Sequence, residues 1–285
     1  FCPTNYLNEN NFELLPLGGI SNNYITLKNI STGDETVAKS DNFGFNNLKD
    51  WNKDSEISYI FLGDSFTYGE DVTHEESFFF YFNKFFPKSL NLGCGGNGPI
   101  VKLATFEEYV VHLKPKIIFW NFYRNDLSKD IMKEINSGYY KYYQNIDFDQ
   151  NLINNQFLID KQLLDFWKQK KIKLDNENNK NKINKIKNFE LKKLIKLQNF
   201  RKRLGLRFGY EPKNLEIYKN IVKRVNNKIK SWDGKLIFVY IPHQDEFNNI
   251  ISRLDSYYFN KNIFDFLDKE KIHLINLEKY FRTQT

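Results

Sequence analysis

Short apolar segments alternate with segments of helical periodicity over most of this chain. Apolar runs of four to six residues, a length typical of buried strands, cover residues 57–62, 89–92, 117–122, 236–241 and 272–277. Between them, apolar residues recur every three or four positions, as on one face of a helix, most regularly at residues 212–232. The alternation predicts a three-layer α/β/α fold around a doubly wound, flavodoxin-like parallel sheet of about five strands.

Two regions stand outside this alternation. Residues 1–52 are rich in turn-forming residues, and we predict a loop-rich N-terminal extension ahead of one α/β domain at residues 53–285. Inside that domain, residues 128–210 replace the alternation with Tyr-rich and then Lys- and Asn-rich sequence. We predict a helical insertion there, of the kind that can act as a lid, with a mobile linker within it.

Polar and small residues come directly after each of the first three predicted strands. Ser65 follows the first strand, a glycine-rich segment at residues 93–98 follows the second, and Asn125 follows the third. Ligands of open parallel sheets bind beyond the carboxyl ends of the strands, where these residues would meet. A serine hydroxyl there can act as a nucleophile, while glycine backbone N–H groups and an asparagine amide can stabilise an oxyanion.

Each of the three segments also has an ordinary structural interpretation. Ser65 can cap a helix, the glycines can form a turn, and Asn125-Asp126 can begin a helix. A shared site is favoured because all three segments are predicted at the same edge of one sheet, which is the arrangement that a catalytic site requires.

The three segments resemble the first three signature blocks of the SGNH hydrolase superfamily, whose members are also called GDSL-like. The matching residues are Gly63-Asp64-Ser65-Phe66-Thr67-Tyr68-Gly69, Asn91-Leu92-Gly93-Cys94-Gly95-Gly96 and Tyr123-Arg124-Asn125-Asp126. The resemblance covers residues 40–130 and, in architecture only, residues 212–280. It implies that Ser65 is the nucleophile and that Gly96 donates a backbone N–H, and Asn125 a side-chain N–H, to the oxyanion. It also implies that no metal or organic cofactor is needed.

The fourth block of the family, an Asp with a His three residues later near the C-terminus, has no match in this chain. His74 falls in a predicted capping box of Thr73 and Glu76, which would start a helix that continues through residues 78–86. Two further histidines have structural interpretations, near a helix end and inside the last predicted strand: His112 and His273. We therefore expect the catalytic histidine, and the helix that normally follows the last strand, to lie in a missing C-terminal segment, which would leave this chain inactive.

His243 is different, because it follows the fourth predicted strand at the sheet edge where Ser65 lies. We predict that His243 contacts substrate. We predict the same of Asp64, which precedes the predicted nucleophile, and of Asp126, which follows the predicted oxyanion donor. The chain offers His243 no placed carboxylate partner, so the residues do not favour it as the general base.

Composition and charge restrict the remaining choices. The net charge is +7 and the pI about 9.0, but the basic excess is concentrated at residues 161–203. No nucleic-acid-binding motif accompanies it, so we predict a solvated helical face and no nucleic-acid partner. Cys2 and Cys94 indicate neither a disulfide framework nor a zinc site. The apolar runs are too short to span a bilayer.

The chain begins at Phe1, and its only methionine is Met132. We expect the natural start to lie upstream, so a membrane anchor could exist only in that missing N-terminal segment. Extracytoplasmic and cytoplasmic locations both stay open.

Together, these observations predict a serine-nucleophile ester hydrolase or O-acyltransferase that acts on an acylated carbohydrate or another small ester. The alternative is a non-catalytic protein of the same fold, a binding or scaffold module whose basic insertion docks an anionic polymer. A flavin- or nucleotide-binding protein would share the sheet, but the loop after the first strand lacks the glycine cluster that cradles phosphate.

Overall fold

Five parallel strands form the main sheet in the order β4-β3-β5-β6-β7, which confirms the predicted doubly wound fold. The computed structural model describes residues 12–28, 32–180, 214–248 and 250–283. The bounds of each strand in this sheet lie within two residues of those of a predicted apolar run: β3 (Tyr59–Leu62), β4 (Ser89–Asn91), β5 (Ile117–Phe122), β6 (Lys235–Tyr240) and β7 (His273–Asn276). The chain leaves β3 in one direction to reach β4 and then crosses back to β5, so the topological switch point lies between β3 and β5.

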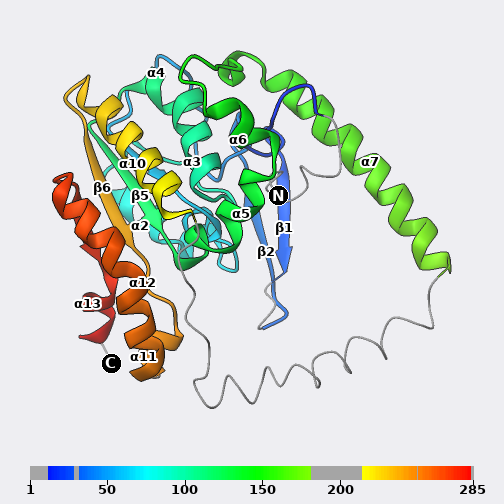
Figure 1. Cartoon of the computed structure of the whole chain (residues 1–285). Helices are drawn as coiled ribbons and strands as arrows, with labels where there is room; N and C mark the ends of the chain where they lie inside the picture. Colours follow the sequence, from blue (N-terminus) through cyan, green and yellow to red (C-terminus); the bar gives the residue numbers. More distant parts are fainter. Residues whose placement is uncertain (1–11, 29–31, 181–213, 249, 284–285) are drawn as a thin grey trace.

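One face of the sheet carries most of the core. It is covered by α3 (Pro99–Thr105), the π-helical turn η3 (Phe106–Val110), α4 (Val111–Leu113), α10 (Leu215–Lys230) and α12 (Ile250–Lys269). Figure 1 shows α3 and α10 side by side on this face. The helical stripe predicted at residues 212–232 is the buried face of α10, where four side chains are fully buried: Tyr218, Val222, Val225 and Ile229.

The opposite face of the sheet has a smaller cluster, centred on stacked rings of Phe61 and Phe119. Helix α2 (Phe78–Phe85) packs against it through Phe79. A capping box is present, since the Glu76 carboxylate accepts a hydrogen bond from the Thr73 N–H (3.0 Å). It starts only the 3₁₀ turn η2 (His74–Glu76), however. Helix α2 begins separately after Ser77, whose hydroxyl accepts from the Phe80 N–H, so the single predicted helix is two elements.

The N-terminal extension contains an antiparallel hairpin that the loop-rich prediction missed, formed by β1 (Tyr24–Lys28) and β2 (Glu35–Lys39). The segment after the hairpin is fixed by a buried carboxylate. Asp41 accepts hydrogen bonds from two backbone N–H groups and from the side chains of Asn47 and Trp51. Burial raises the pKa of Asp41 to about 6. Rings of Phe43 and Trp51 pack on Tyr109 of η3, so this segment is part of the main core.

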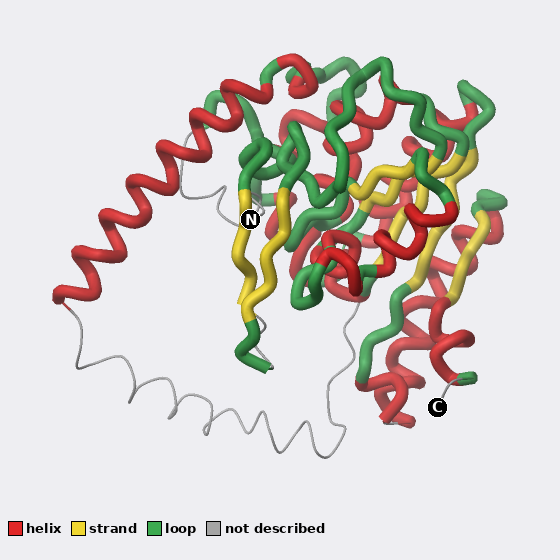
Figure 2. Tube along the Cα trace, turned by 180° about the vertical axis from the view of Figure 1, so that it is seen from behind, coloured by secondary structure: helices red, strands yellow, loops and turns green. Residues whose placement is uncertain are grey.

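The insertion between β5 and β6 is helical where the structure describes it. Its elements are η4 (Arg124–Leu127), α5 (Lys129–Ile135), α6 (Gly138–Tyr143), η5 (Leu152–Asn154) and α7 (Gln156–Lys180). Buried side chains of α5 and α6, such as Ile131 and Tyr139, join the main core, as do Ile159 and Leu163 near the start of α7. The rest of α7 extends away from the sheet in both views (Figures 1 and 2). Residues 181–213 lie outside the described part, as does most of the predicted linker.

The chain after β6 forms α11 (Asp245–Asn248) and α12, and a short helix, α13 (Leu277–Arg282), follows β7. Within the described helices, none combines the length and apolar character that crossing a membrane requires.

Candidate active site

Ser65 is the first residue of a one-turn helix that starts two residues beyond β3. This helix, α1 (Ser65–Tyr68), has Asp64 as its N-cap, because the Asp64 Oδ1 accepts a hydrogen bond from the Phe66 N–H (3.1 Å). The capping role is therefore taken by Asp64 and not by Ser65, which removes the ordinary structural interpretation of the serine. Ser65 stands partly exposed at the carboxyl edge of the sheet, beside the switch point.

Helix α1 is held between the strand-end loops by Thr67, which is fully buried. The Thr67 hydroxyl accepts from the Asn121 side chain (2.8 Å), and the Thr67 carbonyl accepts from the Asn91 side chain (2.6 Å). A Cβ atom added to Gly63 would lie 1.8 Å from the Thr67 hydroxyl oxygen, and one added to Gly93 would lie 2.6 Å from the Thr67 Cβ. Both glycines are thus required by the close packing of the first two blocks.

The loop after β4 is buried at all positions from 91 to 100 except Gly96, which is partly exposed. Gly96 has a φ of +81°, a left-handed conformation that glycine adopts without strain. The loop is joined to the first block by a hydrogen bond from the Cys94 N–H to the Gly63 carbonyl (3.2 Å). Gly96 is thus the partly exposed residue among positions 91–100, and the contact of its backbone N–H with substrate stays a prediction.

Cys94 is disulfide-bonded, a bond that the sequence, which indicates no disulfide framework, did not predict. Only two cysteines occur in the chain, and their spacing carries no recognisable disulfide pattern; Cys2 lies outside the described residues.

Asn125 lies in η4, directly after β5, and is linked to the first block through Asp64. Its Nδ2 donates to the Asp64 Oδ2 (3.3 Å). An amide nitrogen carries two hydrogens, so this bond leaves one for an oxyanion. The Asp64 carboxylate thus connects the backbone of α1 with the asparagine. Three strand-end blocks are in this way hydrogen-bonded into one unit.

Asp64 and Asp126 are 2% and 0% exposed, and the contact with substrate expected of them stays a prediction. In the structure, Asp126 forms a buried ion pair with Lys102 of α3, whose Nζ lies 2.6 Å from the Asp126 Oδ2. The same Nζ donates to the carbonyl of Asn121 in β5 (2.8 Å). Burial raises the pKa of Asp126, and the Lys102 ammonium opposes that rise. Sequence reasoning missed Lys102, because a single lysine in a helix ordinarily faces solvent.

His243 lies at the same sheet edge and ends a row of aromatic rings that begins beside Ser65. The Phe66 ring contacts Tyr123 (4.6 Å between centroids), and Tyr123 stacks on His243 (5.9 Å). The structure also places a carboxylate here that the sequence prediction lacked. Glu246 accepts from the His243 backbone N–H (2.9 Å) and from the Tyr240 hydroxyl. These bonds use the backbone of His243, so they do not by themselves orient its imidazole.

No histidine in the described part of the chain is hydrogen-bonded to Ser65. His74 contacts Asn46 through its Nδ1 (3.1 Å), and burial lowers its pKa. His112 and His273 are exposed, in α4 and at the start of β7. Within the same described residues, no three histidine, cysteine or acidic side chains come together in an arrangement that could hold a metal ion.

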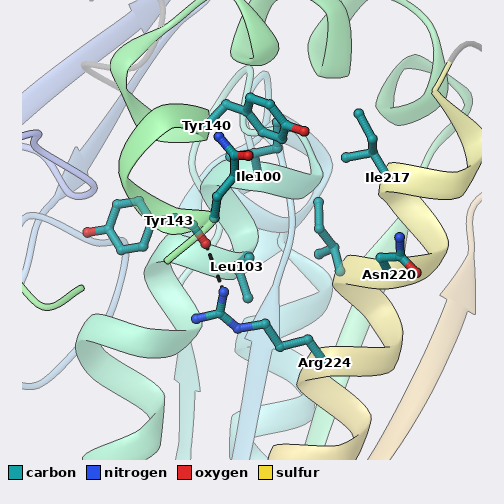
Figure 3. Close-up of a pocket in the computed structure, with 9 residues that line it drawn as sticks. Ile100, Leu103, Tyr140, Tyr143, Ile217, Asn220 and Arg224 are labelled. Carbon is teal, nitrogen blue, oxygen red and sulfur yellow. Dashed lines mark hydrogen bonds between the residues drawn. The ribbon is translucent and has the colours of Figure 1, made fainter. Parts of the chain in front are cut away.

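A cavity of about 260 Å³ opens within the helical layer, away from the three blocks. Figure 3 shows its walls, formed by residues of α3, α6 and α10. Its arginine, Arg224, is already paired with Glu107 (2.8 Å) and bonded to the Tyr143 carbonyl (2.8 Å). The cavity includes none of Ser65, Gly96 and Asn125.

Comparison with known proteins gives no family model that matches the chain and no match among curated proteins. Two similar solved structures are a proposed acylhydrolase from Bacteroides fragilis and a GDSL-like lipase from Bacteroides thetaiotaomicron. The first is 12% identical, with 79% of this chain and 69% of that chain covered and a TM-score of 0.37. The second is 13% identical, with 78% and 68% covered and a TM-score of 0.34.

The structure places three features side by side at one edge of the α/β/α sheet: a switch point beside β3, a serine at the start of α1, and glycine and asparagine residues on the neighbouring loops. They agree with the resemblance to SGNH hydrolases that the sequence carries, and the membership itself stays a prediction.

Proposed function

We propose that this chain carries the nucleophile and oxyanion hole of a serine ester hydrolase or O-acyltransferase. One observation supports the proposal most strongly. The Asp64 carboxylate binds both the Phe66 N–H, next to the proposed nucleophile Ser65, and the Asn125 amide. An arrangement fixed before substrate binds is what stabilises developing charge without reorganisation during the reaction.

In the proposed reaction, the Ser65 Oγ attacks the carbonyl carbon of an ester while a base takes the hydroxyl proton. The carbonyl oxygen becomes an oxyanion, which accepts hydrogen bonds from the N–H groups of Ser65 and Gly96 and from the Asn125 amide. Collapse of this intermediate breaks the ester C–O bond, and the alcohol leaves with a proton. Water or a sugar hydroxyl then attacks the acyl-enzyme, which gives hydrolysis or acyl transfer.

The proposed substrate is an acylated carbohydrate or another small ester. The row of rings beside Ser65 supports this class, because Phe66 is 47% exposed and is followed by Tyr123 and His243. Aromatic faces bind apolar surface while the polar tips of tyrosine and histidine can reach hydroxyl groups. We propose that His243 contacts the substrate as the last member of this row.

A second candidate is a non-catalytic protein that binds its ligand with the same fold. It is favoured by one observation, that no described histidine is bonded to Ser65. A serine hydroxyl with no base is a poor nucleophile. The two candidates share the oxyanion hole and differ in whether Ser65 reacts.

Labelling with a fluorophosphonate, with and without imidazole in the buffer, separates them. Imidazole can supply the base, so the enzyme proposal predicts that Ser65 is labelled at least when imidazole is present. Mass spectrometry of peptides identifies the modified residue, and Ser65→Ala should abolish the signal. Labelling without imidazole would mean that the chain supplies its own base. No labelling of folded protein under either condition would contradict the enzyme proposal and favour the binding protein.

A further inference from the structure

A buried carboxylate of the insertion caps the helix that follows the glycine-rich loop. Glu134 of α5 is 4% exposed and accepts hydrogen bonds from the N–H groups of Gly98 (2.6 Å) and Ile100 (2.8 Å). A third N–H, of Val101, lies 3.4 Å from its Oε1. The first N–H groups of a helix have no partner within the helix. The N-cap of α3 is Gly98, which has no side chain, so Glu134 supplies the missing acceptor from another element.

The fit between this carboxylate and the loop is close. A Cβ atom added to Gly98 would lie 2.7 Å from the Glu134 Oε2 and 2.9 Å from the Cβ of Asp130. Glycine is therefore needed here for the carboxylate to reach the backbone. Gly98 is only two residues after Gly96. The hydrogen bond that the Gly98 N–H donates to Glu134 therefore fixes the segment that carries the proposed oxyanion donor.

The same helix reaches the second donor through Lys102. Its Nζ bonds both carboxylate oxygens of Asp126 (2.8 and 2.6 Å), and Asp126 directly follows Asn125. Helix α3 is thus tied at its first turn to α5, and one turn later to the loop that carries the asparagine. Because one helix holds both attachments, the position of Gly96 relative to Asn125 depends on them.

We propose that Glu134 and Lys102 are positioning residues for the oxyanion hole, which set the separation of the Gly96 N–H from the Asn125 amide. The inference rests on the proposed function, since it gives these residues a role in the same site. It goes beyond that function by placing part of the site's support in the insertion, which supplies Glu134.

The charges around Glu134 make its ionisation observable. Asp126 and Asp130 face it, and Lys133 lies beside it on α5. Burial raises the pKa of Glu134 to about 8, while the N–H groups of Ile100 and Gly98 oppose the rise. Ionisation strengthens hydrogen bonds from these N–H groups, because a charged acceptor binds more tightly than a neutral one. The Gly98 and Ile100 amide resonances should therefore titrate with Glu134.

Glu108 of η3 provides a matched control. It is also fully buried, and its carboxylate accepts from two backbone N–H groups, of Gln150 (2.8 Å) and Leu152 (3.1 Å). It also accepts from the Tyr143 hydroxyl (2.7 Å). These partners all belong to the insertion, and none lies in a strand-end block. Glu108→Gln should disturb folding about as much as Glu134→Gln, because each removes one buried oxygen acceptor of backbone N–H groups, but it should not move a proposed oxyanion donor.

The test compares Glu134→Gln with Glu108→Gln by fluorophosphonate labelling in the presence of imidazole. Small displacements of catalytic groups cost about a hundredfold in rate. We expect Glu134→Gln to lower the maximal labelling rate constant by about ten- to a hundredfold, with the half-saturating reagent concentration unchanged. Glu108→Gln should stay within about twofold of wild type. The double variant Lys102→Met/Asp126→Asn leaves no unpaired charge buried. Its maximal labelling rate constant should fall by about as much as that of Glu134→Gln.

Nuclear magnetic resonance of the amide groups gives a second readout that needs no reaction. In wild type, the Gly98 and Ile100 N–H shifts should titrate at a pH well above the usual range of a glutamate, and this titration should vanish in Glu134→Gln. The Gly96 N–H and the Asn125 side-chain resonances should move in Glu134→Gln and stay in place in Glu108→Gln. An unlabelled wild type would overturn the proposed function, whereas unmoved Gly96 and Asn125 resonances would overturn the positioning role.

Discussion

The two halves of the sheet edge are organised differently. At the ends of β3, β4 and β5, buried side chains such as Thr67 and Asp64 bond from one loop to the next. At the end of β6, the Glu246 side chain bonds within its own segment, to the Tyr240 hydroxyl and the His243 backbone, and the Glu246 carbonyl accepts from Arg282 of α13 (3.1 Å). The first half therefore holds the proposed oxyanion hole in place before substrate arrives. In the second half, where a base would be needed, the described contacts do not direct a histidine towards Ser65.

The largest effect should come from removing an oxyanion donor from the organised half. Asn125→Ala is expected to lower the rate of Ser65 labelling by about a hundred- to a thousandfold, as is usual for one lost donor. The matched control is Asn136→Ala, which removes an exposed amide bonded only to the Met132 carbonyl. It should label at the wild-type rate. Equal rates in Asn125→Ala and wild type would show that this half does not stabilise an oxyanion.

The next largest effect should come from a substitution that disturbs the packing of the same half. Gly93→Ala places a Cβ 2.6 Å from the Thr67 Cβ and 2.7 Å from the Tyr68 backbone nitrogen. Overpacking of this kind costs about 1–3 kcal/mol, so urea unfolding should show a loss of that size. Gly138→Ala is the control, because its Cβ would meet its neighbours at ordinary distances of 3.6 Å or more. A Gly93→Ala protein as stable as wild type would mean that the first two blocks are loosely packed.

A smaller effect is expected on how the free energy of unfolding depends on pH, through Glu134, which links the insertion to the candidate site. The folded pKa of Glu134 is raised to about 8 from its usual 4.5, so the folded state holds more protons between these values. Its contribution to stability is complete below about pH 4.5 and falls as pH rises through 8, by at most about 1.4 kcal/mol per pH unit. Unfolding free energies at pH 5 and pH 8 should therefore differ less in Glu134→Gln than in wild type. If the unfolding free energy changed equally between pH 5 and pH 8 in both proteins, Glu134 would lie in a more polar environment than the structure indicates.

The smallest effect is expected in the second half. His243→Ala should change Ser65 labelling by less than about threefold when imidazole is present, because a contact at the end of the aromatic row does not take the serine proton. A general base contributes about a hundred- to ten-thousandfold. A loss of that size, measured without imidazole, would identify His243 as the base and remove the contrast between the halves.

The sheet was predictable from sequence because its inner strands are largely buried on both faces and its strands appear as short apolar runs. The hairpin of β1 and β2 was not, because the alternation of Ile25 and Leu27 with Thr26 and Lys28 is short and lies among turn-forming residues. On the described face of the hairpin, Tyr24 and Val37 are 69% and 57% exposed. The Thr73–Glu76 capping box was recognisable, but a local cap does not determine how far a helix extends.

For the candidate site, the residues that follow the strands could be predicted to lie at one edge, and the residues that hold them there could not. Ser65, Gly96 and Asn125 follow strands, so their positions at one edge come from the fold itself. Lys102 and Glu134 are single charged residues in helices, where solvent exposure is the usual outcome. Their burial depends on partners that lie about twenty or more residues away along the chain, such as Asp126 and Gly98.

The most direct test of the account is a crystal structure of the protein with a phosphonate bound to Ser65. The phosphonyl oxygen should lie about 3 Å from both the Gly96 nitrogen and the Asn125 Nδ2, the distance at which donors stabilise an oxyanion. An oxygen that points to solvent, or that neither group contacts, would contradict the claim that the first three strand ends form an oxyanion hole.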